Sequence, residues 1–411
     1  MMDSDLFTYT FSNGLRLIHM FSDSPVSYCG LAVNAGARDE EASEYGLAHF
    51  VEHMLFKGTG RRKAHHILNR MENVGGELNA YTSKEETFVY SIFMEEHFGR
   101  ALELLCDIVF DSRFPRQEIE KEVDVILDEI NTYRDSPSEL IFDEFENMLF
   151  ARHALGHNIL GDEGSLPGFG TDSGLSFMER FYAPSNIVFF SMGRIRPDKI
   201  VRMAGKVMPE GRPGAVHKRM PPGAIALQSE RLRRDTHQTH VIMGGRSYGM
   251  YEGDERRIPL FVLNNILGGP GMNSRLNMSL RERHGLAYTV ESSLTSYTDT
   301  GLAAVYFGTD PKNTDKAMAL VGKELDAICR KRLSGSQLAA AKKQITGQLC
   351  VSGDNKESLF LGMGKQFLHH NRYRRLPSLL EKIDGVTAED ILEAANEVFA
   401  PHLLSSLIYE Q

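Results

Sequence analysis

The stretch NAYTSKEETFVYSI (79–92) returns in altered form as TSYTDTGLAAVYFG (295–308), and this repeat organises the whole chain of 411 residues. Tyr81 aligns with Tyr297, which lies 216 residues further on. Solenoid proteins repeat every 20–50 residues, so a repeat of this length indicates a duplicated domain instead. We therefore expect two similar domains, each about half of the chain.

A second pair of segments supports the duplication. FYAPSNIVFF (181–190) resembles VFAPHLLSSL (398–407), and Pro184 then aligns with Pro401 at an offset of 217 residues. Two matches at almost the same offset are what a duplicated domain produces.

The boundary between the two expected domains should lie in MPEGRPGAVHKRMPPGAIAL (208–227), where Pro, Gly and basic residues crowd together without periodicity. We place an N-terminal domain at 1–212, a linker at 213–223 and a C-terminal domain at 224–411.

Both halves mix short β-rich segments, such as LRLIHMF and NIVFFSMG, with longer helical ones. Strands often follow strands and do not alternate strictly with helices. This order predicts an α+β protein, in which each domain is a mostly antiparallel sheet covered by helices. The expected helices include 41–57, 95–110, 117–133 and 314–332.

Composition narrows the function classes. The net charge of −9 argues against nucleic acid as a partner, because a polyanion needs a basic surface. No run of eighteen apolar residues and no signal peptide is visible, so we expect no membrane partner. Four cysteines without paired spacing fit a reduced, cytoplasmic protein.

The segment AHFVEHMLFKG (48–58) carries the first candidate site. On a helix, its apolar residues form one stripe, while His49, Glu52 and His53 cluster on the opposite side. Histidines at i and i+4 can converge on one ion. The alternative is an ordinary exposed polar face, and a metal site requires a third ligand.

A second amphipathic segment, EIEKEVDVILDEINTY (118–133), offers carboxylates for that ligand. Glu122 and Glu129 lie two helical turns apart, on one flank of the apolar stripe. Four other acidic residues of this segment fit a solvated surface, namely Glu118, Glu120, Asp124 and Asp128. Spacing alone does not choose the ligand among the acidic residues.

GLAHFVEHMLFKGT (46–59) together with EIEKEVDVILDEI (118–130) resembles the pitrilysin/insulinase family of zinc peptidases, the inverzincins. The smaller members of that family include mitochondrial processing peptidase and its bacterial relatives. The likeness covers essentially the whole chain, through GGELNAYTSKEET (75–87) to RERHGLAY (281–288).

The resemblance implies one Zn²⁺ per chain, held by His49, His53 and Glu129. Glu122 matches the second glutamate of the family, which supports the site without necessarily touching the ion. Bound zinc would lower the pKa of its water from 15.7 toward about 7. Glu52 would act as general base, taking the proton of the water and passing it to the leaving amine.

The family's arginine–tyrosine pair falls on Arg281 and Tyr288, which the resemblance implies contact the substrate and stabilise the tetrahedral intermediate. Taken alone, they would be one surface arginine and one strand aromatic. The family likewise favours the stretch at 75–83 as an open sheet edge that binds a peptide as an added strand, with Asn79 and Ala80 offering backbone contacts. A buried strand after a glycine turn would give the same pattern.

The expected function is a zinc-dependent endopeptidase acting on short or unfolded peptides. By likeness to longer family members we expect a homodimer, in which Arg281 and Tyr288 of one subunit serve the zinc of the other. An accessory partner chain is the alternative assembly. The rival functions are a non-catalytic scaffold, like the core proteins of the ubiquinol–cytochrome c reductase complex, and a structural zinc site, which normally has four protein ligands.

The adjacent histidines at 65–66 and 369–370 lie on expected helices without a third ligand. We assign both pairs to the surface or to packing.

Overall fold

The structure is a computed structural model that describes residues 5–211 and 218–411, so part of the expected linker at 213–223 falls outside the described residues. Backbone contacts divide the chain into two compact units, and each unit contains a segment from the other half of the chain. Unit 1 is Met1–Asn131, His157–Arg219 and Asn355–Tyr373; unit 2 is Thr132–Gly156, Met220–Asp354 and Arg374–Gln411. No sequence pattern had indicated these two exchanged segments.

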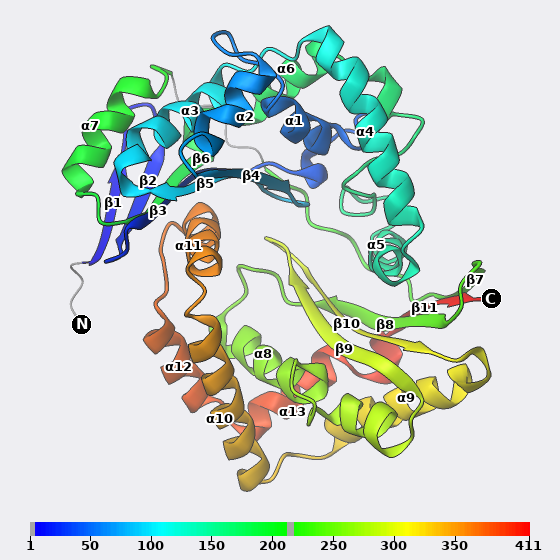
Figure 1. The fold of residues 1–411 in the computed structure, drawn as a ribbon. Coiled ribbons are helices and arrows are strands. Elements are labelled where there is room, and N and C mark those ends of the chain that lie inside the picture. The colour runs from blue at the N-terminus through cyan, green and yellow to red at the C-terminus, as the bar shows by residue number, and fades with distance from the viewer. Residues whose placement is uncertain (1–4, 212–217) are drawn as a thin grey trace. The chain divides into compact units, whose positions relative to one another are not determined.

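Unit 1 is built on a six-stranded sheet with the order β1-β2-β6-β3-β5-β4 (Figure 1). All neighbouring strands are antiparallel except β2 and β6, which are parallel. The strands are β1 Leu6–Thr10, β2 Arg16–Phe21, β3 Val26–Val33, β4 Glu77–Thr82, β5 Thr87–Met94 and β6 Ile187–Gly193.

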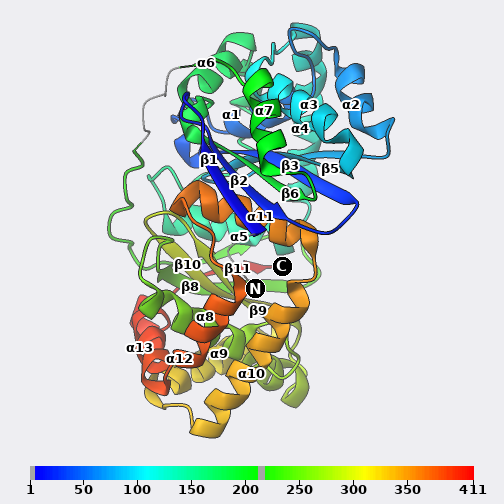
Figure 2. The ribbon, with the colours of Figure 1, turned by 90° about the vertical axis from the view of Figure 1, so that its left-hand side faces the viewer.

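Two separate cores cover the two faces of this sheet (Figures 1 and 2). One face packs against helices from the first half of the chain: α1 Leu47–Leu55, α2 Ala64–Glu72, α3 Phe98–Phe110, α4 Arg116–Arg134, α6 Thr171–Phe181 and α7 Pro197–Val207. The other face packs against the exchanged helix α11, Lys356–His370, where Phe360 stacks on Phe190 with ring centroids 4.4 Å apart. Helix α11 is therefore part of the core of unit 1.

Unit 2 repeats this plan with a five-stranded sheet of order β7-β11-β8-β10-β9, in which β7 and β11 are the parallel pair. Its strands are β7 Ser229–Arg233, β8 Thr239–Ser247, β9 Ala287–Ser296, β10 Gly301–Thr309 and β11 Ser405–Glu410. Its helices are α8 Asp254–Gly268, the π-helix η6 Asn277–Arg283, α9 Thr314–Arg330, α10 Gly335–Ser352, α12 Leu376–Gly385 and α13 Ala388–Val398. The exchanged helix α5, Pro137–Leu149, packs with Tyr297 and Tyr306 in a core of its own.

The two sheets correspond strand for strand once β1 is set aside, because β2-β6-β3-β5-β4 and β7-β11-β8-β10-β9 have the same order and directions. The helices follow at similar offsets: α3 begins at residue 98 and α9 at 314, while α5 begins at 137 and α11 at 356. The expectation of an α+β protein made of two similar sheet-plus-helix domains is confirmed.

One expected helix is shorter than its apolar pattern suggested. The segment 41–57 becomes helical only at Leu47, because Gly46 takes the left-handed backbone conformation with φ of 96°. Leu47, Phe50, Val51, Met54 and Leu55, the expected apolar stripe, are all fully buried. The stripe thus places α1 on the sheet, but the helix itself starts after the glycine.

Within the described ranges, no helix has the length and apolar character needed to cross a membrane. The four cysteines are all free thiols; three are buried and Cys350 is exposed.

Candidate metal centre

The start of α1 is fixed by a buried carboxylate. Glu40 accepts hydrogen bonds from the backbone N–H groups of Gly46 at 2.9 Å and Ala48 at 2.7 Å, which are unpaired donors of the first helical turn. Its Oε2 also lies 2.9 Å from Nε2 of His157. Burial raises the pKa of Glu40, and the two backbone hydrogen bonds oppose that rise. Glu40 therefore anchors the helix that carries the candidate ligands.

His49, His53 and Glu129 meet at one point, although Glu129 comes from α4. The two Nε2 atoms are 3.2 Å apart, and Oε2 of Glu129 lies 3.7 Å from Nε2 of His49 and 3.5 Å from Nε2 of His53. A tetrahedral zinc ion with ligands at about 2.0–2.1 Å separates its ligand atoms by about 3.3 Å. The three atoms already have the spacing that such an ion requires, and they form a group able to hold a metal.

The protonation of the two imidazoles also fits a metal centre. His49 is buried, and burial followed by the proximity of His53 lowers its pKa to about 4, so the ring is neutral at pH 7. Its Nδ1 has no hydrogen-bond partner in the described part of the chain. Two nitrogens facing each other at 3.2 Å with at most one proton between them leave a lone pair available for a cation.

Glu122 holds the far side of the second imidazole. Its Oε1 lies 2.8 Å from Nδ1 of His53, and its Oε2 lies 2.5 Å from Nζ of Lys57. Burial disfavours protonation of His53, but the hydrogen bonds to Glu122 and Glu129 outweigh it and raise the pKa to about 9 in the metal-free protein. A carboxylate on Nδ1 fixes Nε2 as the metal-facing nitrogen.

Glu52 lies on the same helix but is not one of the three converging residues. Burial raises its pKa, which hydrogen bonding to Thr82 lowers in part. Thr82 is the last residue of β4. Glu52 thus joins the helix of the two histidines to the end of β4, and it is a carboxyl whose pKa is raised above the ordinary value.

Strand β4 is an edge strand, because it pairs with β5 and ends the sheet. Asn79 and Ala80 lie in this strand, opposite Tyr90 and Val89, and both are partly buried. The strand contacts α1, the helix of the histidines. Peptide binding at Asn79 and Ala80 stays a prediction, for which an unpaired strand edge beside the metal-binding group is the required geometry.

Arg281 and Tyr288 lie in unit 2, on η6 and in β9. The structure brings them together, since the guanidinium carbon of Arg281 is 5.3 Å from the ring centroid of Tyr288. Tyr288 is 79% exposed, which is unusual for a tyrosine in a strand and leaves its hydroxyl free to meet a ligand. Their expected role at the zinc stays a prediction.

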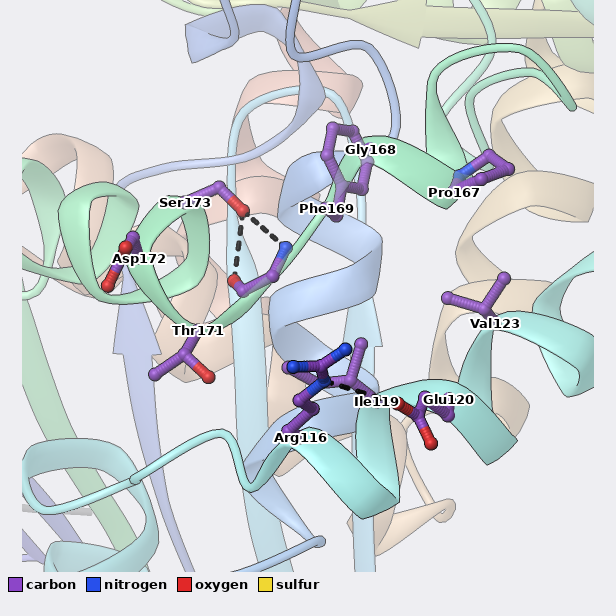
Figure 3. A pocket seen from close by; sticks show the side chains of 11 residues that line it. Arg116, Ile119, Glu120, Val123, Pro167, Gly168, Phe169, Thr171, Asp172 and Ser173 are labelled. Atoms are coloured by element: carbon purple, nitrogen blue, oxygen red, sulfur yellow. Dashed lines mark hydrogen bonds and ion pairs between the residues drawn. The ribbon is translucent and has the colours of Figure 1, made fainter.

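A separate cavity of about 800 Å³ lies where the first turns of α4 meet the loop before α6 (Figure 3). Ile119 and Val123 line it from α4, and Phe169 from the loop. Ser173 pairs with the backbone N–H and carbonyl of Gly170 in its wall, as the dashed lines in Figure 3 show. None of the three metal-binding residues lines this cavity, so the two features of α4 are distinct.

Sequence reasoning missed three residues that support the centre: Lys57, Glu40 and Thr82. Lys57 had a local signal only on the expected helix 41–57, where it follows His53 by four residues; the helix itself ends at Leu55. Glu40 and Thr82 had none, since each reaches α1 through tertiary contacts.

The donor set of two imidazoles and one carboxylate, with a separate carboxyl nearby, is typical of a catalytic zinc centre. The comparisons with known proteins show which family the chain belongs to. Residues 18–163 match the family described as Insulinase (Peptidase family M16), and residues 171–345 match the Peptidase M16 inactive domain. The chain belongs to peptidase family M16, the insulinase family.

Relatives of similar length are named zinc proteases. The chain is 32% identical to the uncharacterized zinc protease YmxG of Bacillus subtilis over 406 residues, which cover 97% of each chain. It is 33% identical to an uncharacterized zinc protease of Mycobacterium tuberculosis over 403 residues, covering 96% of this chain and 90% of that protein.

Solved structures share the fold over the whole chain. One is a peptidase M16 inactive domain from Pseudomonas fluorescens, with a TM-score of 0.90 and 19% identity over 98% of this chain and 97% of that one. Another is a protease from Helicobacter pylori, also with a TM-score of 0.90 and 19% identity, over 99% of both chains. At this identity the likeness establishes the fold alone.

Proposed function

We propose that the protein is a zinc-dependent endopeptidase that hydrolyses short or unfolded peptides in the cytoplasm. The observation that carries the proposal is the convergence of His49, His53 and Glu129, with the buried carboxyl of Glu52 on the same helix as the two histidines. The names of the relatives, which are zinc proteases, support the choice of metal and of reaction class.

His49, His53 and Glu129 would hold the ion and leave a fourth position open toward solvent and substrate. Zinc bound there would supply Lewis acidity and a water with a pKa near about 7. Glu122 keeps Nδ1 of His53 engaged, so that the imidazole presents Nε2 to the ion throughout the reaction.

Glu52 would do the proton transfer. As a carboxylate it would take a proton from the attacking water, and as a carboxylic acid it would give that proton to the leaving amine. The raised pKa of Glu52 suits both steps, because a general acid–base works best when its pKa approaches the working pH.

The substrate would lie along β4 as an added strand, with its backbone groups paired to those of Asn79 and Ala80. Such a binding mode contacts the backbone of the substrate more than its side chains, which suits short and unfolded peptides of varied sequence. Arg281 and Tyr288 would donate hydrogen bonds to the carbonyl oxygen as negative charge develops on it.

The test is digestion of a peptide library by the wild-type protein, with and without a chelator, beside the variant Glu52→Gln. We expect the chelator to abolish cleavage and the variant to lose about 10²–10⁴-fold in kcat while it keeps its zinc. Glu120→Gln, a change at an exposed carboxylate of α4, is the matched control. Full activity in Glu52→Gln, or cleavage that survives complete removal of metal, would contradict the proposal.

The proposed assembly is a homodimer, with an accessory partner chain as the alternative. Mixing His49→Ala protein with an Arg281→Ala/Tyr288→Phe variant should restore part of the activity if each subunit lends these two residues to the other. No recovery in mixtures whose subunits have demonstrably exchanged would refute the arrangement but leave the peptidase activity untouched. Metal analysis of the purified protein addresses the scaffold alternative, since a non-catalytic scaffold needs no stoichiometric zinc.

A further inference from the structure

A hollow of about 430 Å³ runs along α2 and is lined only by basic and amide side chains. Four of its lining residues are arginines, namely Arg61, Arg62, Arg70 and Arg100; the others are two histidines and two asparagines. None of these side chains is acidic and none is apolar. This composition provides hydrogen-bond donors and positive charge without an opposing carboxylate at the surface of the hollow.

The hollow follows one face of a helix. His65, His66 and Asn69 project from α2 at spacings of three and four residues, and Arg100 comes from α3, which contacts α2 (Figure 1). The histidine pair at 65–66, which we predicted from the sequence to serve the surface or packing, is exposed and forms part of this lining. The lining is therefore assembled from α2, the residues that flank it and α3.

Two of the arginines are held in place by carboxylates of α3, the buried Asp107 and the partly exposed Glu103. Arg62 pairs with both oxygens of Glu103 at 2.7 and 2.8 Å and with Asp107 at 2.5 Å. Arg70 pairs with Glu103 at 3.2 Å. These two guanidiniums are neutralised, but they are also oriented, so a ligand would not have to order them.

The other two arginines supply net charge. Arg61 and Arg100 have no carboxylate partner among the described residues, and the one hydrogen bond of the Arg100 guanidinium goes from Nη1 to the carbonyl oxygen of Arg70 at 3.0 Å. That contact holds Arg100 beside α2 while its charge stays unbalanced. Oriented guanidinium groups whose charge is not balanced by a carboxylate bind phosphate groups through bidentate hydrogen bonds.

We propose that this hollow binds a small compound that carries two or more phosphate groups. Its volume lies within the range of small-ligand sites, about 300–1,000 Å³. A long polyanion is disfavoured, because the chain as a whole has a net charge of −9. The proposal does not depend on the peptidase activity.

The test is a calorimetric titration of the full-length, zinc-loaded protein with inorganic tripolyphosphate. We expect saturable binding at one site, weakened by about tenfold or more in Arg61→Gln/Arg100→Gln. The matched control is Arg196→Gln/Arg202→Gln, which removes the same charge from the exposed pair around Asp198 and should bind within about twofold of wild type. Unchanged zinc content and circular dichroism would show that both variants fold.

Three results would overturn the proposal. Binding that persists in Arg61→Gln/Arg100→Gln would place the anion elsewhere, for example on the ion of the metal centre, which this variant retains. Equal weakening in both double variants would show a general charge effect. Tighter binding of a short single-stranded oligonucleotide or of anionic lipid vesicles than of tripolyphosphate would point to a macromolecular partner. If the double variant fails to fold, Arg61→Gln alone, a change at an exposed side chain, must still weaken binding.

Discussion

Glu122 is hydrogen-bonded to the imidazole of His53 on the side that faces away from the metal position, with 2.8 Å between Oε1 and Nδ1. The carboxylate is itself held by Lys57. The contact decides which nitrogen of His53 is available to a metal and makes that nitrogen more electron-rich. A residue that need not touch the ion can in this way set its affinity.

Removing the support of His53 should weaken metal binding. We expect Glu122→Gln to raise the zinc dissociation constant by about 10–100-fold, and Lys57→Met to raise it less, because Glu122 keeps His53 as a partner. Competition with a chromophoric chelator measures both constants. Lys63→Met, a change at an exposed lysine, is the control; a Glu122→Gln variant with wild-type affinity would contradict the role assigned to Glu122.

The anchor of α1 can be removed without touching the metal-binding group. Glu40→Ala leaves the backbone N–H groups of Gly46 and Ala48 buried without partners, and we expect it to lower the free energy of unfolding by about 2 kcal/mol or more. Glu41→Ala changes an exposed neighbour and should stay within about 0.5 kcal/mol of wild type. Urea unfolding of the metal-free proteins provides the comparison, and equal stability of the two variants would refute the anchoring role.

Two glycines of α11 offer a matched pair of substitutions. A Cβ at Gly364 would come within 2.7 Å of the ring of Phe190, so Gly364→Ala should push the helix from the sheet and destabilise the protein by about 1–3 kcal/mol. A Cβ at Gly362 meets nothing within 4 Å, so Gly362→Ala should stabilise by about 0.5–1 kcal/mol through helix propensity. Thermal unfolding distinguishes them. Shifts of the same sign would mean that α11 does not pack on the first sheet as described.

Glu86 should make the free energy of unfolding depend on pH in the acidic range. Although burial opposes ionisation, the hydrogen bond from His369 and the charge of Lys365 hold the pKa of Glu86 at about 2. The carboxylate therefore contributes about 3 kcal/mol above pH 4.5, and this contribution is lost as the pH falls from about 4.5 to about 2. Glu86→Gln should flatten the stability curve over that range.

Unfolding of the metal-free protein between pH 2 and 7 tests this dependence, with Glu96→Gln, a change at an exposed carboxylate, as control. A Glu86→Gln variant that loses as much stability on acidification as wild type would show that other carboxylates carry the effect.

The sequence predicted those features that leave a local or repeated pattern. The apolar stripe of α1 placed His49, Glu52 and His53 together. The duplicated segments predicted two similar domains, and the structure gives these domains sheets of the same strand order once β1 is set aside. The choice of Glu129 among six acidic residues of its helix depended on family likeness, since spacing alone does not choose among them.

The remaining features depend on neighbours that are distant along the chain. His49 lies on the polar side of its own helix and is nevertheless buried, and no local pattern reveals this. The apolar side chains of α11 likewise predict a helix with one buried face, but they do not say which of the two sheets that face will cover. Similarly, the basic hollow along α2 needs Arg100 from another helix.

The exchange of α5 and α11 bears on how such a chain arose. Each half of the chain carries one such helix, and in this structure that helix covers the second face of the other half's sheet. Two copies of a half-length precursor with the same arrangement would have exchanged these helices, as domain-swapped dimers do. Tandem fusion of the gene would have made the association of the two halves intramolecular, with an effective concentration in the millimolar range. Either half expressed alone should then be insoluble, and the two expressed together should rescue each other.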